Sequence, residues 1–193
     1  MFFLGKAALR PVPRWALVRE DVVTRVESQL EDDGDALQKR LDGAYRDMDR
    51  RQPELAEWLA EQVAGRSDDL AQSLGYFLIV TVYLAFREAF PSRLSAIDAT
   101  HLSLARETFD ADAALRRDDP SEVVETDDLV GMTQPSLVQF IQHHLDEAIE
   151  QAGESPDLDS FDHVYRTVLV EVIALSHAVL PPEGHIQSGP ALA

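Results

Sequence analysis

One pattern of helix signals occurs twice in this chain, and it limits the folds open to the sequence. The motif Gln-Pro-x-Leu at residues 52–55 returns at 134–137. Ala-Gly-x-Ser-x-Asp-Leu at 64–70 returns at 152–158, with five of the seven residues identical. Matches that keep their order along a chain indicate an internal repeat. Convergent patterning of buried helices is the alternative, but apolar periodicity alone does not explain shared turn and cap residues.

Each repeat predicts a helical hairpin. A proline at the first helical position begins an amphipathic helix, a short Ala-Gly turn follows, and an apolar helix then runs to a proline stop at Pro91 or Pro181. A short turn forces the two helices of a unit to lie antiparallel. We therefore expect two duplicated antiparallel helical hairpins in a pseudo-twofold relation, with a longer first helix in the second hairpin.

The apolar run from Leu74 to Phe86 predicts a helix with no polar face, which other helices must surround. Its 13 residues cover roughly 20 Å at the α-helical rise, which is less than the ~30 Å of a bilayer core. We therefore expect a buried core helix and no integral membrane segment.

Apolar periodicity together with proline and glycine punctuation predicts an all-α helical bundle of about six to seven helices. The expected helices cover about 19–31, 35–51, 53–64, 68–90, 95–117, 135–152 and 159–180. Asp35 is expected to cap the second of these, and Ser67 or Asp68 the fourth.

These helices form one expected domain, residues 19–182, with repeat halves at about 19–91 and 92–182. The acidic segment 118–133 is expected to be a loop, and 183–193 a disordered tail.

The charge balance narrows the classes of partner. The chain has 35 acidic and 17 basic residues and a net charge of −18, so its body repels nucleic acids and anionic membranes. It contains no cysteine, which excludes disulfides and zinc-thiolate sites and fits a cytoplasmic protein. We expect no nucleic-acid partner.

The first 18 residues differ from the rest because they carry Lys6, Arg10 and Arg14, large apolar side chains and no acid. This basic and apolar N-terminal arm has two interpretations. It either covers the core of its own chain or docks on a protein partner, a second copy or a membrane surface.

Three residues are candidates for a site. His144 and Glu147 lie one helical turn apart at the edge of an apolar stripe, and Glu171 is the one charge in the middle of the last apolar helix. Thr167, Glu171, Ala174 and Ala178 form a narrow strip that we expect to face solvent. The alternative is a buried Glu171 with a raised pKa.

No catalytic, cofactor-binding or metal-binding set is recognisable. The paired Glu-x-x-His motifs of helical metal proteins are missing, and so are phosphate loops and nucleophile elbows. The sequence favours a non-enzymatic protein-interaction module that binds a protein partner or a second copy of itself. The alternative is a ligand- or metal-binding bundle, or an enzyme, with a pocket between the hairpins near His144, Glu171 or the tyrosines Tyr76, Tyr83 and Tyr165.

Overall fold

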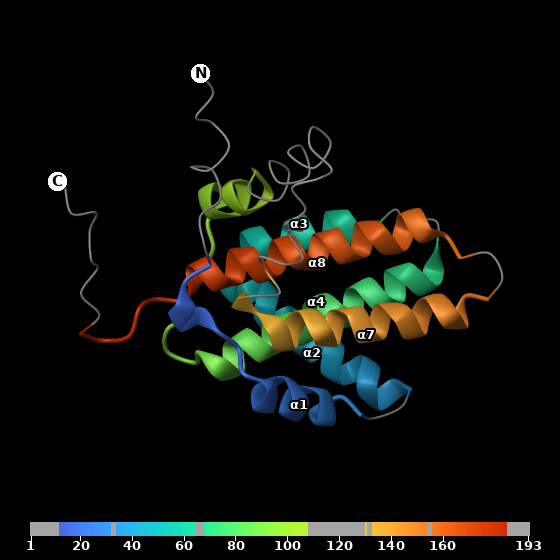
Figure 1. The fold of residues 1–193 in the computed structure, drawn as a ribbon, viewed down its shortest axis with the longest axis horizontal. Helices are drawn as coiled ribbons and strands as arrows, with labels where there is room; N and C mark the ends of the chain where they lie inside the picture. The colour runs from blue at the N-terminus through green and yellow to red at the C-terminus, as the bar shows by residue number, and fades with distance from the viewer. Residues whose placement is uncertain are drawn as a thin grey trace, which may run out of the picture.

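The computed structural model describes residues 12–31, 34–64, 68–107, 130, 133–153 and 156–184, and in these residues the chain is an all-helical bundle (Figure 1). The elements are η1 (Arg14–Ala16), α1 (Glu20–Gln29), α2 (Asp35–Arg51), α3 (Pro53–Val63), α4 (Asp69–Ala89), α7 (Pro135–Gln151) and α8 (Leu158–Ala178), with a further helix at 99–107. The fold class predicted from the sequence is confirmed.

The two apolar helices α4 and α8 form the centre of the bundle and share its most extensive helix–helix interface. Each also contacts the first helix of the other hairpin, since α3 packs on α8 and α7 packs on α4 (Figure 1). The close approach depends on Gly75 of α4. A Cβ atom there would lie 3.3 Å from methyl groups of both Val63 and Val164.

The ends of the hairpin helices follow the predicted signals. Pro53 and Pro135 occupy the first turns of α3 and α7. Asp68 caps α4 by accepting a hydrogen bond from the Ala71 amide at 2.7 Å, and Asp157 caps α8 in the same way. At 17 residues, α7 is longer than α3 with 11, as the repeat alignment predicts.

One predicted helix cap and one predicted helix start are wrong. The N-cap of α2 is Gly34, whose φ of 59° suits glycine, so Asp35 lies inside the first turn and does not cap it. The helix expected from residue 95 begins at 99. Residues 95–97 do not join the helix because their backbone groups are hydrogen-bonded to a distant side chain. Asp98 begins the helix by accepting a hydrogen bond from the His101 amide at 2.9 Å.

Two buried glutamines bind the backbone of segments that are remote from them in sequence. Gln52 donates to the Ser95 carbonyl at 2.8 Å and accepts from the Ile97 amide at 2.7 Å. Gln134 donates to the Ala16 carbonyl at 2.6 Å and accepts from the Val18 amide at 2.9 Å.

Both glutamines are N-caps, with nearly identical backbone angles. Each half of the chain therefore holds the segment that begins the other half. This arrangement supports the pseudo-twofold relation, whereas duplication of the sequence stays a prediction.

The described part of the N-terminal arm packs against the chain's own core. Ala16 and Val18 are fully buried, and the indole nitrogen of Trp15 donates to the Val179 carbonyl at 3.0 Å. Residues 1–11 of the arm lie outside the described residues, as do 108–129 and 185–193, which include most of the expected loop and tail.

We expect Gln134→Ala to lower the free energy of unfolding by about 2 to 4 kcal/mol, because the Val18 amide and Ala16 carbonyl lose their partner in the interior. Chemical denaturation measures the change. Gln142→Ala on the exposed side of the same helix is the matched control, and we expect it to change stability by less than about 0.5 kcal/mol. Equal effects of the two variants would show that the buried amide does not hold the arm.

Candidate functional site

An open groove of about 690 Å³, bounded by described residues, runs along α4. We call it the α4 groove. Its lining consists of Leu37, Gln38, Leu41, Tyr45, Ala60, Val63, Ala64, Leu70, Gln72, Ser73, Leu74, Tyr76, Phe77, Ile79, His144, Glu147, Ala148 and Gln151. Most of these side chains are apolar, and the polar ones come from several helices, as is typical of small-molecule sites.

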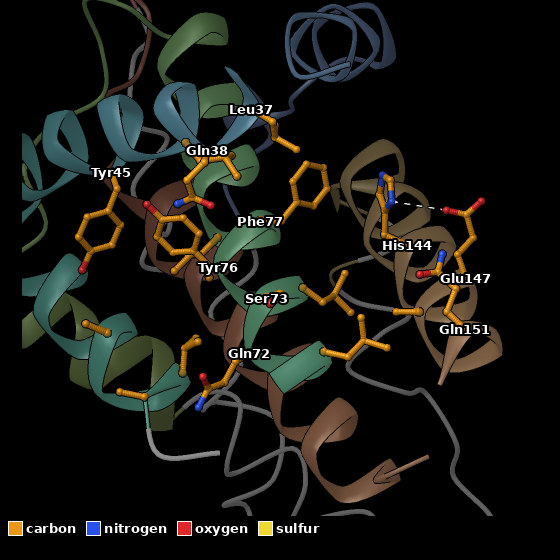
Figure 2. Close-up of a pocket in the computed structure, with 18 residues that line it drawn as sticks. Leu37, Gln38, Tyr45, Gln72, Ser73, Tyr76, Phe77, His144, Glu147 and Gln151 are labelled. Atoms are coloured by element: carbon orange, nitrogen blue, oxygen red, sulfur yellow. Dashed lines mark ion pairs between the residues drawn. The ribbon is translucent and has the colours of Figure 1, made fainter. Parts of the chain in front are cut away.

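Figure 2 shows how the helices build the α4 groove. Tyr76 and Phe77 project from α4, with Gln38 of α2 beside them and His144 of α7 on the opposite side. The groove exists because α4 is only partly covered, and both Tyr76 and Phe77 are half-buried. The sequence predicts an α4 that is surrounded on all sides, and this prediction is wrong for the face that carries these two residues.

A hydrogen-bonded tyrosine pair forms the α2 side of the groove. The hydroxyl of Tyr76 donates to Asp42 at 3.0 Å, and Gln38 donates to the same carboxylate oxygen at 2.7 Å. The Tyr45 ring lies 5.7 Å from the Tyr76 ring, and its hydroxyl donates to the Ala56 carbonyl at 3.2 Å. Burial, reinforced by nearby carboxylates, raises the pKa of both tyrosines, so they remain neutral hydrogen-bonding groups.

His144 forms the α7 side of the groove. Its ring packs edge-on against Phe77 and Phe140, with centroid distances of 5.1 and 4.5 Å. Nε2 lies 3.5 Å from a carboxylate oxygen of Glu27, and Nδ1 lies 3.8 Å from Glu147. Burial lowers the pKa of His144, and the two glutamates only partly oppose that shift, so the ring is neutral at pH 7.

Glu171 does not face solvent, and the expected solvent-facing strip is wrong. Its side chain is fully buried, and neither carboxylate oxygen has a hydrogen-bond partner. Thr167, Ala174 and Ala178 are buried as well, because α3, α4 and α7 all pack on α8. Burial raises the pKa of Glu171 well above its ordinary value, so the carboxyl group keeps its proton to a higher pH than an exposed glutamate does.

The structure thus separates the three candidates. His144 and Glu147 share the α4 groove, whereas Glu171 lies in the core and does not line this groove. Of the tyrosines, only Tyr76 reaches the groove. Tyr165 lines a separate small cavity with Gln142.

The third tyrosine, Tyr83, is fully buried and donates to Asp47 at 2.9 Å. Asp47 also pairs with Arg87 at 2.7 Å and Arg51 at 3.1 Å. Burial raises the pKa of Asp47, but these hydrogen bonds outweigh it and lower the pKa to about 2. Tyr83 therefore belongs to an ion-pair network that ties α4 to α2.

Sequence reasoning missed Tyr45, Gln38 and Asp42. The spacing of Gln38 and Asp42 is a recognisable signal, since it places them one turn apart on α2. Nothing in the sequence indicates that α4 brings Tyr76 to the same carboxylate.

No group of three or more metal-ligating side chains that could hold a metal ion occurs within the part of the chain that the structure describes. Among the described helices, α4 is long and apolar enough to cross a membrane by length and composition, but 56% of that stretch is buried inside the bundle. Burial of this extent is what the core helix of a bundle shows.

Comparisons with protein-family models, curated proteins and solved structures give no match for this chain.

We expect Glu171→Gln to be increasingly more stable than the wild type as pH rises. Because the folded chain keeps the Glu171 proton above the pH at which the unfolded chain releases it, wild-type stability is lost as pH rises toward the raised pKa. The difference between the two proteins should grow by about 1.4 kcal/mol per pH unit from about pH 4.5 upward. Urea denaturation between pH 4 and 8 measures it.

Glu57→Gln removes the same charge from an exposed position and serves as the control. Identical pH profiles of wild type and Glu171→Gln would contradict a buried, unpaired carboxyl group.

Proposed function

We propose that this chain is a non-enzymatic binding protein whose α4 groove takes up a small, largely apolar molecule that carries no negative charge. The observation that supports it is the α4 groove itself, with an apolar floor and a few neutral polar groups at its sides. A cavity of about 690 Å³ lies in the usual range for small-molecule sites.

The charge of the groove supports the exclusion of anions. Its described lining contains Glu147 and no lysine or arginine, and Asp42 accepts a hydrogen bond from Tyr76 at its α2 side. The whole chain adds a net charge of −18. A carboxylate or phosphate ligand would lose its hydration and meet only negative charge, whereas a neutral or cationic molecule would not.

The polar groups of the α4 groove suit binding better than covalent chemistry. Ser73 donates its hydroxyl hydrogen to the Asp69 carbonyl at 2.8 Å rather than to a base. Both tyrosines are held neutral, and the nearest carboxylate to His144 Nδ1 is 3.8 Å away. Within the described residues the groove therefore has no nucleophile paired with a general base.

The protein-interaction module favoured by the sequence would use the same surface. An amphipathic helix from a partner could lay an apolar face along α4 in the manner of helix-in-groove recognition. The feature of the α4 groove that favours the small molecule is that its polar groups converge from opposite sides on one apolar floor.

We expect the neutral, polarity-sensitive dye Nile red to bind the wild-type protein with saturable fluorescence, and Ser73→Trp to weaken its affinity by about tenfold or more. Ser73 is exposed at the groove, so an indole there fills the cavity without disturbing the core. Ser28→Trp on exposed α1, away from the groove, is the matched control. The anionic dye anilinonaphthalene sulfonate should bind more weakly than Nile red.

Equal dye affinity in Ser73→Trp, Ser28→Trp and the wild type would show that the α4 groove is not a binding site. Native mass spectrometry of freshly purified protein adds an independent readout. A retained small mass that is lost in Ser73→Trp supports the proposal, and a stoichiometric protein partner released by Ser73→Trp favours the interaction module instead.

A further inference from the structure

A second cavity, on a different side of α3 from the α4 groove, has the opposite charge character. It has a volume of about 210 Å³ and lies between α3, the helix at 99–107 and α8. We call it the basic pocket. Its polar lining consists of Gln62, Arg106, His163, Arg166 and Thr167, with Trp58 as its aromatic wall. Among the described residues of this lining, none has an acidic side chain.

Arg106 is the unusual member of the basic pocket. Its guanidinium carbon lies 5.9 Å from the centroid of the Trp58 ring, in cation–π contact. No described carboxylate lies within ion-pair distance of it. The chain has twice as many acids as bases, and other arginines such as Arg25 and Arg87 are paired with them. Arg106 is stacked on tryptophan and lines a cavity, and it therefore departs from the usual pairing of arginines with acidic side chains in this chain.

The other side chains of the basic pocket come from a rigid part of the fold. His163 Nε2 lies 3.1 Å from the Gln62 carbonyl oxygen. Because a carbonyl only accepts hydrogen bonds, Nε2 carries a hydrogen, and this bond ties α8 to the end of α3. Arg166 and the buried Thr167 follow on α8, so their backbone positions are fixed by the core.

These residue types suit an oxyanion. Arginine guanidinium groups present forked N–H donors that match the oxygens of carboxylate and phosphate groups. Two arginines from different helices converge here with a hydroxyl and an amide as further donors. A cavity of about 210 Å³ holds an anionic group rather than a large ligand.

We propose that the basic pocket binds a small oxyanion, a phosphate or carboxylate group, with Arg106 as its main donor. This inference is independent of the α4 groove, whose described lining contains no lysine or arginine and lies on other helix faces. The chain then has two binding surfaces with opposite charge preference.

The experiment is a titration of the full chain with inorganic phosphate, followed by NMR of the Trp58 indole N–H. The chain has two tryptophans, so a Trp15→Phe spectrum assigns the peaks. We expect a saturable shift of the Trp58 peak at constant ionic strength. Arg106→Gln should weaken phosphate binding at least about tenfold. The affinity of Arg106→Lys should lie between those of the wild type and Arg106→Gln, because lysine keeps the charge but loses the forked N–H donors.

Arg46→Gln removes the same charge from an exposed position on α2 that does not line the pocket, and it should leave phosphate affinity unchanged. A parallel titration with acetate distinguishes phosphate from carboxylate groups. A saturable response to either anion supports the proposal, and the ratio of the two affinities shows which group is preferred.

Two results would overturn it. One is a Trp58 peak that responds to neither anion beyond the effect of equal chloride. The other is an Arg106→Gln protein that melts at a lower temperature but binds phosphate as the wild type does, because the arginines would then have only a structural role.

Discussion

The burial of α4 against α8 is the constraint on which the rest of the structure depends. Each helix is too apolar to remain exposed, and the short connections to α3 and α7 fix what can cover it. The two helices pack along their length, Gly75 permits the close approach, and the first helix of each hairpin contacts the apolar helix of the other. The outer helices then cover the remaining apolar surface, completely in the middle of α8 and incompletely on α4.

The two buried glutamines make this core into one folding unit. Each lies where an amphipathic helix begins, and each uses its amide oxygen and amide nitrogen to bind the backbone of a distant segment, residues 95–97 for Gln52 and residues 16–18 for Gln134. If either amide lost its partners, the backbone groups left unpaired in the interior would lower the free energy of unfolding. Neither half can therefore reach its final arrangement alone, since the segment that satisfies Gln52 belongs to the second half and the segment that satisfies Gln134 belongs to the first.

The sequence could predict the helices because their limits are local. Pro53, Pro135 and Asp68 act on neighbouring backbone groups, and the structure places each where its chemistry requires. The sequence could not predict that residues 95–97 stay outside the helix, because the competing hydrogen bonds come from Gln52, which is more than forty residues away. The repeated Gln-Pro motif marks the right residue, but nothing local shows what its amide holds.

The candidate site was predictable only in part, for the same reason. The position of His144 at the edge of an apolar stripe placed it correctly at a rim, yet the groove behind it arises from which face of α4 the outer helices leave open. Helical periodicity likewise assigned the small and polar strip of α8 to solvent. That strip is buried because three helices enclose α8, which is a property of the assembled bundle.

The aligned positions Thr81 and Glu171 show what this difference in enclosure means for the two halves. Both are buried, but the Thr81 hydroxyl donates to the Phe77 carbonyl one turn back at 2.8 Å, so its helix satisfies it. A glutamate side chain is too long to use its own backbone in that way, and Glu171 has no other partner. Its uncompensated burial opposes folding, and keeping its proton limits that cost to the burial of a neutral group. The fold therefore tolerates an unsatisfied acid in the enclosed middle of α8, whereas the aligned Thr81 of α4, the helix that borders the open groove, is satisfied by its own backbone.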